Sequence, residues 1–431
     1  MSFQTGLSGL NASARNLDVI GNNIANANTT GTKASRAEFS GLVSSALSSA
    51  SAGGAGIGVE VAAVSQQFTQ GNISTTNNNL DVAINGSGFF QLTQNDGSPA
   101  YTRDGSFKLD KDGFLRTNAG ANLMGYPTDI DGNTTSVSLQ KLQLPTNAPI
   151  AASATTTVSA EFNLDARAKG PAATLADGKP PVPRSTYGTS LNVYDSQGVA
   201  STANFYFVKK DEGPLPDVPN TWEVFDSLNV AAIPITTLTF DPNGNLGAPT
   251  TTIATGINAG KFGVTLTSPT TFATSNPNDT DGFLDGPLDI VFDKATQFGT
   301  SFAVSNLTQD GFTAGELTGL NIGDDGIITA RYSNGETQSA GKIALADFRN
   351  IQGLVPMGGN AWAATSESGL PVQGAPGEGK FGILRSGALE ESNVDLTAEL
   401  VNMMTAQRAY QANAQTIKTQ DQVLQTLVNL R

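Results

Sequence analysis

The residue types that most often do chemistry in proteins are missing from this sequence. Its 431 residues include no His and no Cys. This excludes Ser/His/Asp and Cys/His nucleophilic systems, disulfides, and zinc sites built from His or Cys. Only carboxylate, Lys or Tyr chemistry remains. We therefore predict no catalytic residue, and an enzyme is the least favoured class.

Carboxylate pairs, which could hydrolyse glycosides, are the first chemistry left to consider. Four acidic residues lie near predicted turns, but distance along a chain does not set their separation in space. These four are Glu316, Asp324, Asp325 and Glu336. We interpret them as solvated turn residues, because acidic side chains are rarely buried without a partner.

Glycine-rich and acidic loops resemble cofactor and metal sites only in part. Residues 377–382 match G-x-G-x-x-G, yet Pro376 precedes them and no strand-like run leads in. Residues 374–380 match the start of a phosphate-binding loop, but Phe381 replaces the Ser or Thr that would hold Mg²⁺. We predict turns here, with no cofactor-binding residue.

Two Asp-x-Asp-Gly segments, at residues 129–132 and 279–282, could begin calcium loops. Their first ligand position is Pro127 or Pro277, and no glutamate follows at the twelfth position. Type I′ turns explain both segments. The sequence therefore predicts no metal ligand.

Charge and composition limit the partners of the chain. Its formal net charge is -14, so the clustered Lys and Arg of a nucleic-acid binder are lacking. Charged residues make up only 14%, while Gly alone contributes 47 residues, so the surface is largely uncharged and polar. We found no run of 18 apolar residues and no signal-peptide pattern at the N-terminus. Motifs alone thus predict a cytoplasmic protein without membrane insertion.

Both ends of the chain carry apolar residues in alternating steps of three and four, which predicts two heptad-patterned helices. The residues expected to pack these helices together, and against copies of the chain, are Phe3, Leu7, Leu10, Leu17, Ile24, Leu396, Leu400, Met403, Tyr410, Ile417, Leu424 and Val428. Ser392 with Asp395 fits a capping box for the second helix. The alternative is two ordinary amphipathic helices on a globular core.

The two predicted helices should be weak as an isolated pair. Ala14, Gly21, Gln407 and Asp421 occupy positions of the heptad seam that normally carry large apolar side chains. Small or polar residues there bury little apolar area. We therefore expect the helices to order fully only when neighbouring copies bury them, which favours a self-assembling structural subunit.

The chain between the helices has a β texture. Short β-branched or aromatic runs alternate with turn dipeptides such as Asn243-Gly244 and Asn334-Gly335. Residues 40–58 are small and predict an extended connector or flexible loop. Residues from about 146 to 300 are richer in Thr, Ser and Pro and indicate an inserted outer domain.

Four sequence blocks resemble the bacterial flagellar rod, hook and hook-associated proteins. They are Asn22–Lys33, Asn79–Phe90, Tyr101–Phe107 and the run from Ser392 to Leu430. Thr32 departs from the family pattern, where an aromatic residue is common. The chain length, the inserted β domain and the block Ala361–Thr365 look most like the hook members. The resemblance covers residues 1–145 and 300–431.

The resemblance, together with the residue patterns, predicts a multidomain α+β fold. The N- and C-terminal helices pair as a coiled-coil-like α domain, followed by two mainly antiparallel β domains, with the outer one inserted in the inner one. The expected ranges are 1–32 plus 392–431 for the helical domain, 33–75 for a connector, 76–145 plus 300–391 for the inner β domain and 146–299 for the outer β domain.

The resemblance implies a subunit that polymerises into a flexible tube, the flagellar hook, which transmits motor torque and encloses an export channel. Implied partners are many copies of the same chain, the distal rod, the hook cap, the hook–filament junction proteins and the flagellar type III export apparatus. Export without a cleaved signal, to an extracellular site on the basal body, replaces the cytoplasmic prediction. The remaining alternatives are a straight distal rod protein and a β-rich surface adhesin, for which glycan binding by residues 146–300 would be the sign.

Two roles stay open from the sequence. Asn22, Asn23, Asn26 and Asn28 either line an inner channel with uncharged polar groups or end the first helix, as Asn favours caps and turns. Residues 40–58 act either as a hinge or as a wedge between neighbouring subunits.

Overall fold

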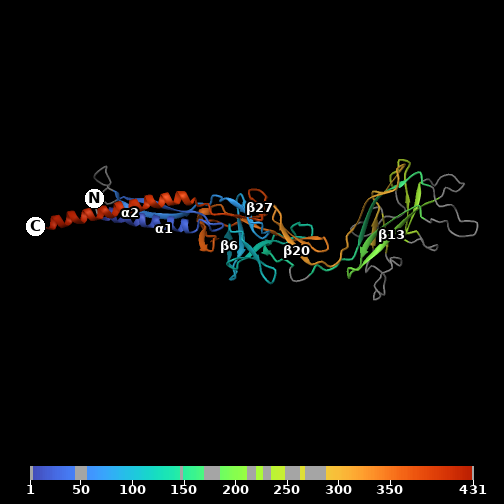
Figure 1. Ribbon diagram of the computed structural model, residues 1–431, viewed down its shortest axis with the longest axis horizontal. Coiled ribbons are helices and arrows are strands. Elements are labelled where there is room, and N and C mark those ends of the chain that lie inside the picture. Colours follow the sequence, from blue (N-terminus) through green and yellow to red (C-terminus); the bar gives the residue numbers. More distant parts are fainter. Residues whose placement is uncertain are drawn as a thin grey trace, which may run out of the picture. The chain divides into compact units, whose positions relative to one another are not determined.

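The computed structural model describes residues 3–43, 56–145, 149–168, 185–210, 220–226, 234–247, 263–266 and 288–429. The described chain is mostly β structure, with one long helix near each end (Figure 1). It separates into two compact units. Unit 1 comprises Met1–Asn147, Thr318–Arg331 and Thr337–Arg431, and unit 2 comprises Ala148–Leu317 and Tyr332–Glu336.

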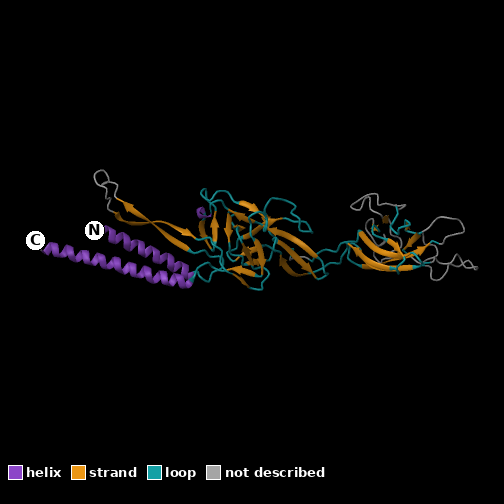
Figure 2. Ribbon diagram, turned by 90° about the horizontal axis from the view of Figure 1, so that it is seen from above, coloured by secondary structure: helices purple, strands orange, loops and turns teal. Residues whose placement is uncertain are grey.

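Both helices belong to unit 1. α1 (Phe3–Ala25) has 23 residues and α2 (Leu396–Asn429) has 34. They lie side by side and antiparallel, with Gly6 beside Ile417 and Asn23 beside Glu399 (Figures 1 and 2). α2 is therefore longer than α1 by about three turns.

Asp395 caps the N-terminus of α2. Its Oδ1 accepts hydrogen bonds from the backbone N–H groups of Thr397 at 2.9 Å and Ala398 at 3.1 Å. The predicted capping box of Ser392 with Asp395 is wrong, because the helix begins three residues later than that pairing requires. The Ser392 hydroxyl instead accepts from the N–H of Val394 at 3.3 Å, outside the helix.

A long antiparallel hairpin follows α1. β1 (Ser35–Val43) pairs with β2 (Gly56–Gln66), and the hairpin extends along the helical end of unit 1 (Figure 2). It contacts α1, where the N–H of Val59 donates to Ser8 Oγ at 3.3 Å. Only the two edges of the small-residue segment 40–58, residues 40–43 and 56–58, are thus described as strand, and residues 44–55 lie outside the described residues.

The large sheet of unit 1 is built from short antiparallel strands. Its main path runs through β20 (Leu317–Ile322), β21 (Ile327–Tyr332), β22 (Thr337–Ile343), β9 (Asn122–Tyr126), β5 (Phe89–Thr93), β6 (Pro99–Thr102), β25 (Ala361–Ala363) and β24 (Val355–Gly358). Side strands are β7 (Phe107–Leu109), β8 (Leu115–Thr117), β10 (Gln140–Lys141), β23 (Leu345–Asp347) and β26 (Val372–Gly374). A short 3₁₀ helix, η2 (Ile351–Gly353), precedes β24. The core of this large sheet contains the fully buried side chains Phe90, Leu92, Leu115 and Leu123.

Two small ladders join the early part of the chain to the segment that leads into α2. β3 (Ile73–Thr75) pairs with β28 (Ala388–Glu390), and β4 (Val82–Asn85) pairs with β27 (Ile383–Ser386). Both pairings are antiparallel. They bring the residues after α1 and before α2 to one place at the base of the helix pair.

Unit 2 has two sheets around one core. The first contains β11 (Thr157–Asp165), β16 (Gly263–Leu266), β17 (Leu288–Val291), β18 (Thr296–Phe298) and β19 (Ala303–Gln309). The second contains β12 (Tyr187–Tyr194), β13 (Ala200–Lys209), β14 (Thr221–Phe225) and β15 (Thr236–Thr239). Phe162 from the first sheet and Phe207 and Trp222 from the second belong to the same buried cluster. Alternate residues of β11 are buried, as expected for a sheet with one face in a core.

Candidate assembly site

Small residues bring α1 close to α2. A Cβ atom added at Gly6 would lie 3.1 Å from Cγ1 of Ile417, and one at Gly9 would lie 2.9 Å from Nδ2 of Asn413. The same Asn413 amide donates to Ser13 Oγ at 3.4 Å. A larger side chain on this face would push the helices apart, so the contact depends on close approach rather than on large apolar groups.

The positions on α1 that contact α2 are shifted by one residue along the sequence from the predicted seam. Of the predicted α1 set, Leu7 is 43% exposed, while Leu10, Leu17 and Ile24 are half-buried. On α2, Met403 and Ile417 are half-buried. The exposed members of the predicted set on α2 are Leu396, Leu400, Tyr410 and Leu424. The side chains of Phe3 and Val428 lie outside the described residues.

The structure thus brings Ile417 onto α1 and leaves several other predicted seam residues exposed. The seam was predicted from large apolar residues, but the contacting side of α1 carries Gly6, Gly9 and Ser13 at steps of three and four. That spacing of small residues is a signal that sequence reasoning missed. Whether the exposed residues pack against other copies stays a prediction.

Asn23 ties three segments together at the end of α1. It is 3% exposed. Its amide Nδ2 donates to the carbonyl of Ser35 at 2.8 Å and to Glu399 Oε1 at 3.3 Å, and its Oδ1 accepts from the N–H of Ser35 at 2.9 Å. One side chain therefore links α1, the start of β1 and the first turn of α2. The sequence did not indicate this buried role.

The other three asparagines lie near the end of α1. Asn26 Nδ2 donates to the Asn22 carbonyl at 2.9 Å and to its Oδ1 at 3.1 Å. Asn22 and Asn28 are exposed. These bonds form at the last turn of the helix, where the Asn22 carbonyl also accepts from the N–H of Asn26 at 3.1 Å. Channel lining by these residues stays a prediction.

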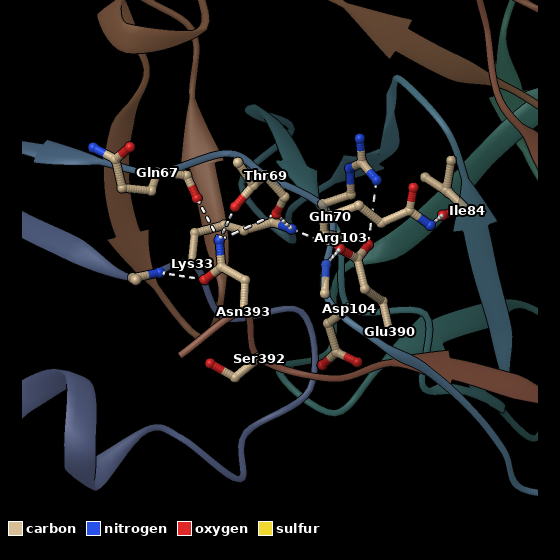
Figure 3. A network of polar contacts seen from close by, with 12 residues as sticks. Lys33, Gln67, Thr69, Gln70, Ile84, Arg103, Asp104, Glu390, Ser392 and Asn393 are labelled. Carbon is tan, nitrogen blue, oxygen red and sulfur yellow. Dashed lines mark hydrogen bonds and ion pairs between the residues drawn. The ribbon is translucent and has the colours of Figure 1, made fainter. Parts of the chain in front are cut away.

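A buried ion cluster lies at the base of the helix pair (Figure 3). Its centre is Glu390, the last residue of β28, whose side chain is fully buried. Glu390 Oε1 accepts from Lys33 Nζ at 2.6 Å and from the N–H of Gly71 at 2.9 Å, and Oε2 accepts from Arg103 Nη1 at 3.2 Å. One carboxylate therefore serves two cations, and we call Lys33, Arg103 and Glu390 the junction cluster.

Each cation of the junction cluster also donates a hydrogen bond to a backbone carbonyl group. Lys33 Nζ donates to the carbonyl of Thr69 at 2.7 Å, and Arg103 Nη2 donates to the carbonyl of Gly86 at 2.9 Å. The Arg103 guanidinium also lies 5.2 Å from the centre of the Phe89 ring. These bonds fix the positions of both cations from several sides.

Burial dominates the electrostatics of the junction cluster. Burial lowers the pKa of Lys33 and the pKa of Arg103, and the Glu390 carboxylate opposes both shifts. Removing one partner of a buried pair leaves an uncompensated charge, which is strongly destabilising. Glu390 is therefore required for the two cations to stay buried.

Asn393 extends the junction toward α2. Its Oδ1 accepts from the N–H of Ala34 at 2.7 Å, and its Nδ2 donates to the carbonyl of Gln67 at 2.7 Å and to Thr69 Oγ1 at 2.8 Å. This amide joins the segment before α2 to the segments on both sides of the β1–β2 hairpin (Figure 3). Asn393 thereby holds together the segment after α1, the segment before α2 and the segments at both ends of the hairpin.

Gly31 shows why the chain after α1 needs a glycine. Its φ is +69°, and a Cβ there would lie 2.5 Å from the backbone nitrogen of Asp104 and 2.8 Å from the carbonyl carbon of Arg103. The N–H of Gly31 donates to the carbonyl of Glu390 at 2.8 Å, and Thr30 Oγ1 donates to Asp104 Oδ1 at 3.0 Å. Only glycine suits both this left-handed backbone and this close approach.

The junction gathers residues from all four sequence blocks that carry the flagellar resemblance. Lys33 comes from the first, Gly86 from the second, Arg103 from the third and Asn393 from the fourth. The arrangement suits a mechanical tie between the helices and the β part of unit 1. Glu390, its centre, lies just outside the fourth block and was not predicted, because no local pattern marks it.

The residues weighed for catalysis and ligand binding lie on the surface or in turns of the described part of the chain. Glu316, Asp324, Asp325 and Glu336 are all exposed. Residues 377–382 form a turn, in which the N–H of Gly377 donates to the carbonyl of Gly382 at 3.1 Å. No cluster of acidic residues suited to a metal is found among the described residues, and residues 279–282 lie outside them. None of the described helices is long and apolar enough to cross a membrane.

Models of flagellar protein families match most of the chain. Residues 3–33 match "Flagella basal body rod protein" and residues 83–158 match "Flagellar hook protein FlgE/F/G D1 domain". Residues 163–312 match "Flagellar basal body protein FlaE D2 domain" and residues 385–430 match "Flagellar basal body rod FlgEFG protein C-terminal". The first and last of these models cover the whole of α1 and the whole of α2.

Relatives match over the whole length. The flagellar hook protein FlgE of Escherichia coli (strain K12) is 42% identical over 442 residues and covers 100% of both chains. That of Borreliella burgdorferi is 34% identical, with 100% of this chain and 99% of the relative covered. The Helicobacter pylori flagellar hook protein FlgE2 has a similar fold, with a TM-score of 0.51 at 16% identity, covering 74% of this chain and 100% of that one. The chain belongs to the flagellar hook protein family, which is structural and not enzymatic.

Proposed function

We propose that this chain is the subunit of a flexible tubular hook, which transmits motor torque from rod to filament and encloses an export channel. The observation that carries this proposal is the helix pair, which leaves apolar side chains on α2 exposed in a single chain. Contiguous exposed apolar surface marks interaction sites. The full-length match to hook proteins supports the choice of the hook over the distal rod.

The finer architecture of the proposed subunit follows the predicted domains. α1 and α2 form a coiled-coil-like pair that, with copies from neighbouring subunits, makes the inner wall of the tube. The predicted ranges are 76–145 plus 300–391 for the inner β domain and 146–299 for the outer β domain inserted in it, but unit 2 extends to Leu317, so β19 goes with the outer domain. Support comes from the antiparallel contacts between α1 and α2 and from the separation of unit 2 as its own compact body.

Torque must pass from the helices to the β part of each subunit, and the junction cluster is suited to carry it. Buried charge-assisted hydrogen bonds have restricted geometry and resist displacement more than exposed ones. Glu390 comes before α2, and its carboxylate binds both Lys33, which comes after α1, and Arg103 of the β part. A subunit can then keep this base rigid while its contacts with neighbours change as the tube bends.

The proposed partners follow from the place of the hook. They are many copies of the same chain, the distal rod, the hook cap, the hook–filament junction proteins and the flagellar type III export apparatus. The proposed location is extracellular, at the basal body, after export without a cleaved signal. Asn22 and Asn28, which are exposed, are our candidates to line the channel.

Deleting residues 1–30 tests the assembly proposal. We expect a soluble chain that forms no tubes, because α2 loses the partner that orients it. The buried core around Phe90 and Leu123 should still unfold cooperatively, which separates failed assembly from failed folding. Electron micrographs and sedimentation are the measurements. Normal tubes from the deleted chain would contradict the assembly role of α1, and straight rigid tubes from the intact chain would contradict the hook.

A further inference from the structure

The end of α2 extends beyond α1. Because Gly6 faces Ile417 and Asn23 faces Glu399, Phe3 lies level with about residue 420 of α2. Leu424 follows Ile417 by one heptad, on the side that faces α1, and is 55% exposed. We call residues 421–429, with the exposed Val423 and Leu424, the overhang.

The opposite end of α2 carries a second exposed apolar group. Leu396, Leu400 and Met404 are spaced by four residues, so they lie in one row along the helix. Each is about half exposed, at 46%, 46% and 52%. We call these three residues the ridge. The row lies beside the face that contacts α1, so it remains open when the helices pair.

We propose that the overhang of one copy packs on the ridge of the next copy, in a head-to-tail contact. The inference rests on the proposed function and names how the copies meet. A contact between two different patches of one chain does not close on itself and can generate an open helical polymer. Leu400 and Leu424 are 24 residues apart on one helix, about 36 Å, so the contact cannot form within a single chain.

Charge favours the same orientation. The ridge end carries Glu391, Asp395 and Glu399, with no basic residue before Arg408. The overhang end carries Lys418 and Arg431 against Asp421. A head-to-tail contact also brings the partial negative end of one α2 toward the partial positive start of the next. Two overhangs meeting each other would lack both complementarities.

Cysteine crosslinking tests the contact directly, because the chain has no Cys of its own. Under mild oxidation, an assembled L400C/L424C variant should give a ladder of covalent multimers on a denaturing gel. The matched control is A409C/L424C, because Ala409 is exposed on α2 but lies away from the ridge row. The control should stay monomeric on the gel. A ladder from the control alone, or no ladder from tubes of L400C/L424C, would overturn the proposal.

Mixing two defective chains provides a second test. The variants V423S/L424S and L400S/M404S change only exposed side chains, so each should fold, and neither should polymerise alone. Mixed together, they retain one intact overhang and one intact ridge, so sedimentation should show a dimer and no tube. Tubes from either variant alone would overturn the head-to-tail contact. An intact chain that never assembles would instead contradict the proposed function.

Discussion

The helix pair and the junction below it are built in opposite ways. The junction cluster buries three charged side chains, and each has more than one fixed partner. The helix pair meets through Gly6, Gly9 and Ser13, while much of α2 stays exposed. From this difference we infer that the polar groups of the junction find their partners within one chain. The apolar side chains of the helices, in contrast, become buried only when other copies cover them. Substitutions should therefore affect stability at the junction and assembly at the helices.

The largest expected effect is from Glu390→Gln. It leaves Lys33 and Arg103 buried without a carboxylate, so unit 1 should lose about 3–5 kcal/mol in free energy of unfolding. The chain has two tryptophans, Trp362 in unit 1 and Trp222 in unit 2, so a Trp222→Phe background makes Trp362 fluorescence a reporter of unit 1 alone. Denaturant unfolding in that background is the measurement.

The control for this substitution is the neighbouring Glu391→Gln. Glu391 is exposed, and its side chain accepts a bond from Asn72 at 3.3 Å. Exposed substitutions of this kind usually change stability by less than about 0.5 kcal/mol. Equal losses from both variants would show that the junction cluster is no more important than an ordinary surface charge, and the contrast with the helices would disappear.

Gly31→Ala should give the next largest loss. Gly31 and Gly379 both have a positive φ, at +69° and +61°, but only at Gly31 would a Cβ meet backbone atoms. Gly379→Ala should cost about 1 kcal/mol from backbone strain, and Gly31→Ala about 2–4 kcal/mol because a clash is added. The same Trp362 unfolding measurement compares them. Similar losses would mean that the close approach to Asp104 relaxes easily.

Asn23→Ala tests the point where the two regions meet. It removes the partner of both backbone groups of Ser35, so unit 1 should lose about 1–3 kcal/mol. Asn22→Ala, at an exposed neighbour, should change stability by less than about 0.5 kcal/mol. Hydrogen exchange of α1 and β1 amides should become faster only in the Asn23 variant. If the exchange rates did not change, Asn23 would not stabilise the single chain as the junction residues do.

Local patterns allowed the elements to be predicted, but not the long-range contacts between them. Both terminal helices were predicted, and the glycines of the predicted turn dipeptides Asn243-Gly244 and Asn334-Gly335 have a positive φ. The junction could not be predicted, because Lys33 and Glu390 lie 357 residues apart in sequence and no periodicity connects them. The contact face of α1 was missed because apolar periodicity gives no weight to glycine. The heptad patterns thus predicted that two helices would form, but they did not predict which face of α1 would contact α2.

The smallest expected effect on stability is from Leu400→Ala, and it gives the sharpest test of the comparison. Leu400 is about half exposed on α2, so its truncation should cost the isolated chain less than about 0.5 kcal/mol. Leu384→Ala removes the same atoms from the buried core of unit 1 and should cost about 2–5 kcal/mol. Assembly should show the reverse order: at a concentration where both chains are folded, the critical concentration for tubes should rise more for Leu400→Ala than for Leu384→Ala. Because stability and assembly are measured on the same two variants, a Leu400 variant that assembles normally would show that this face of α2 is complete in the single chain.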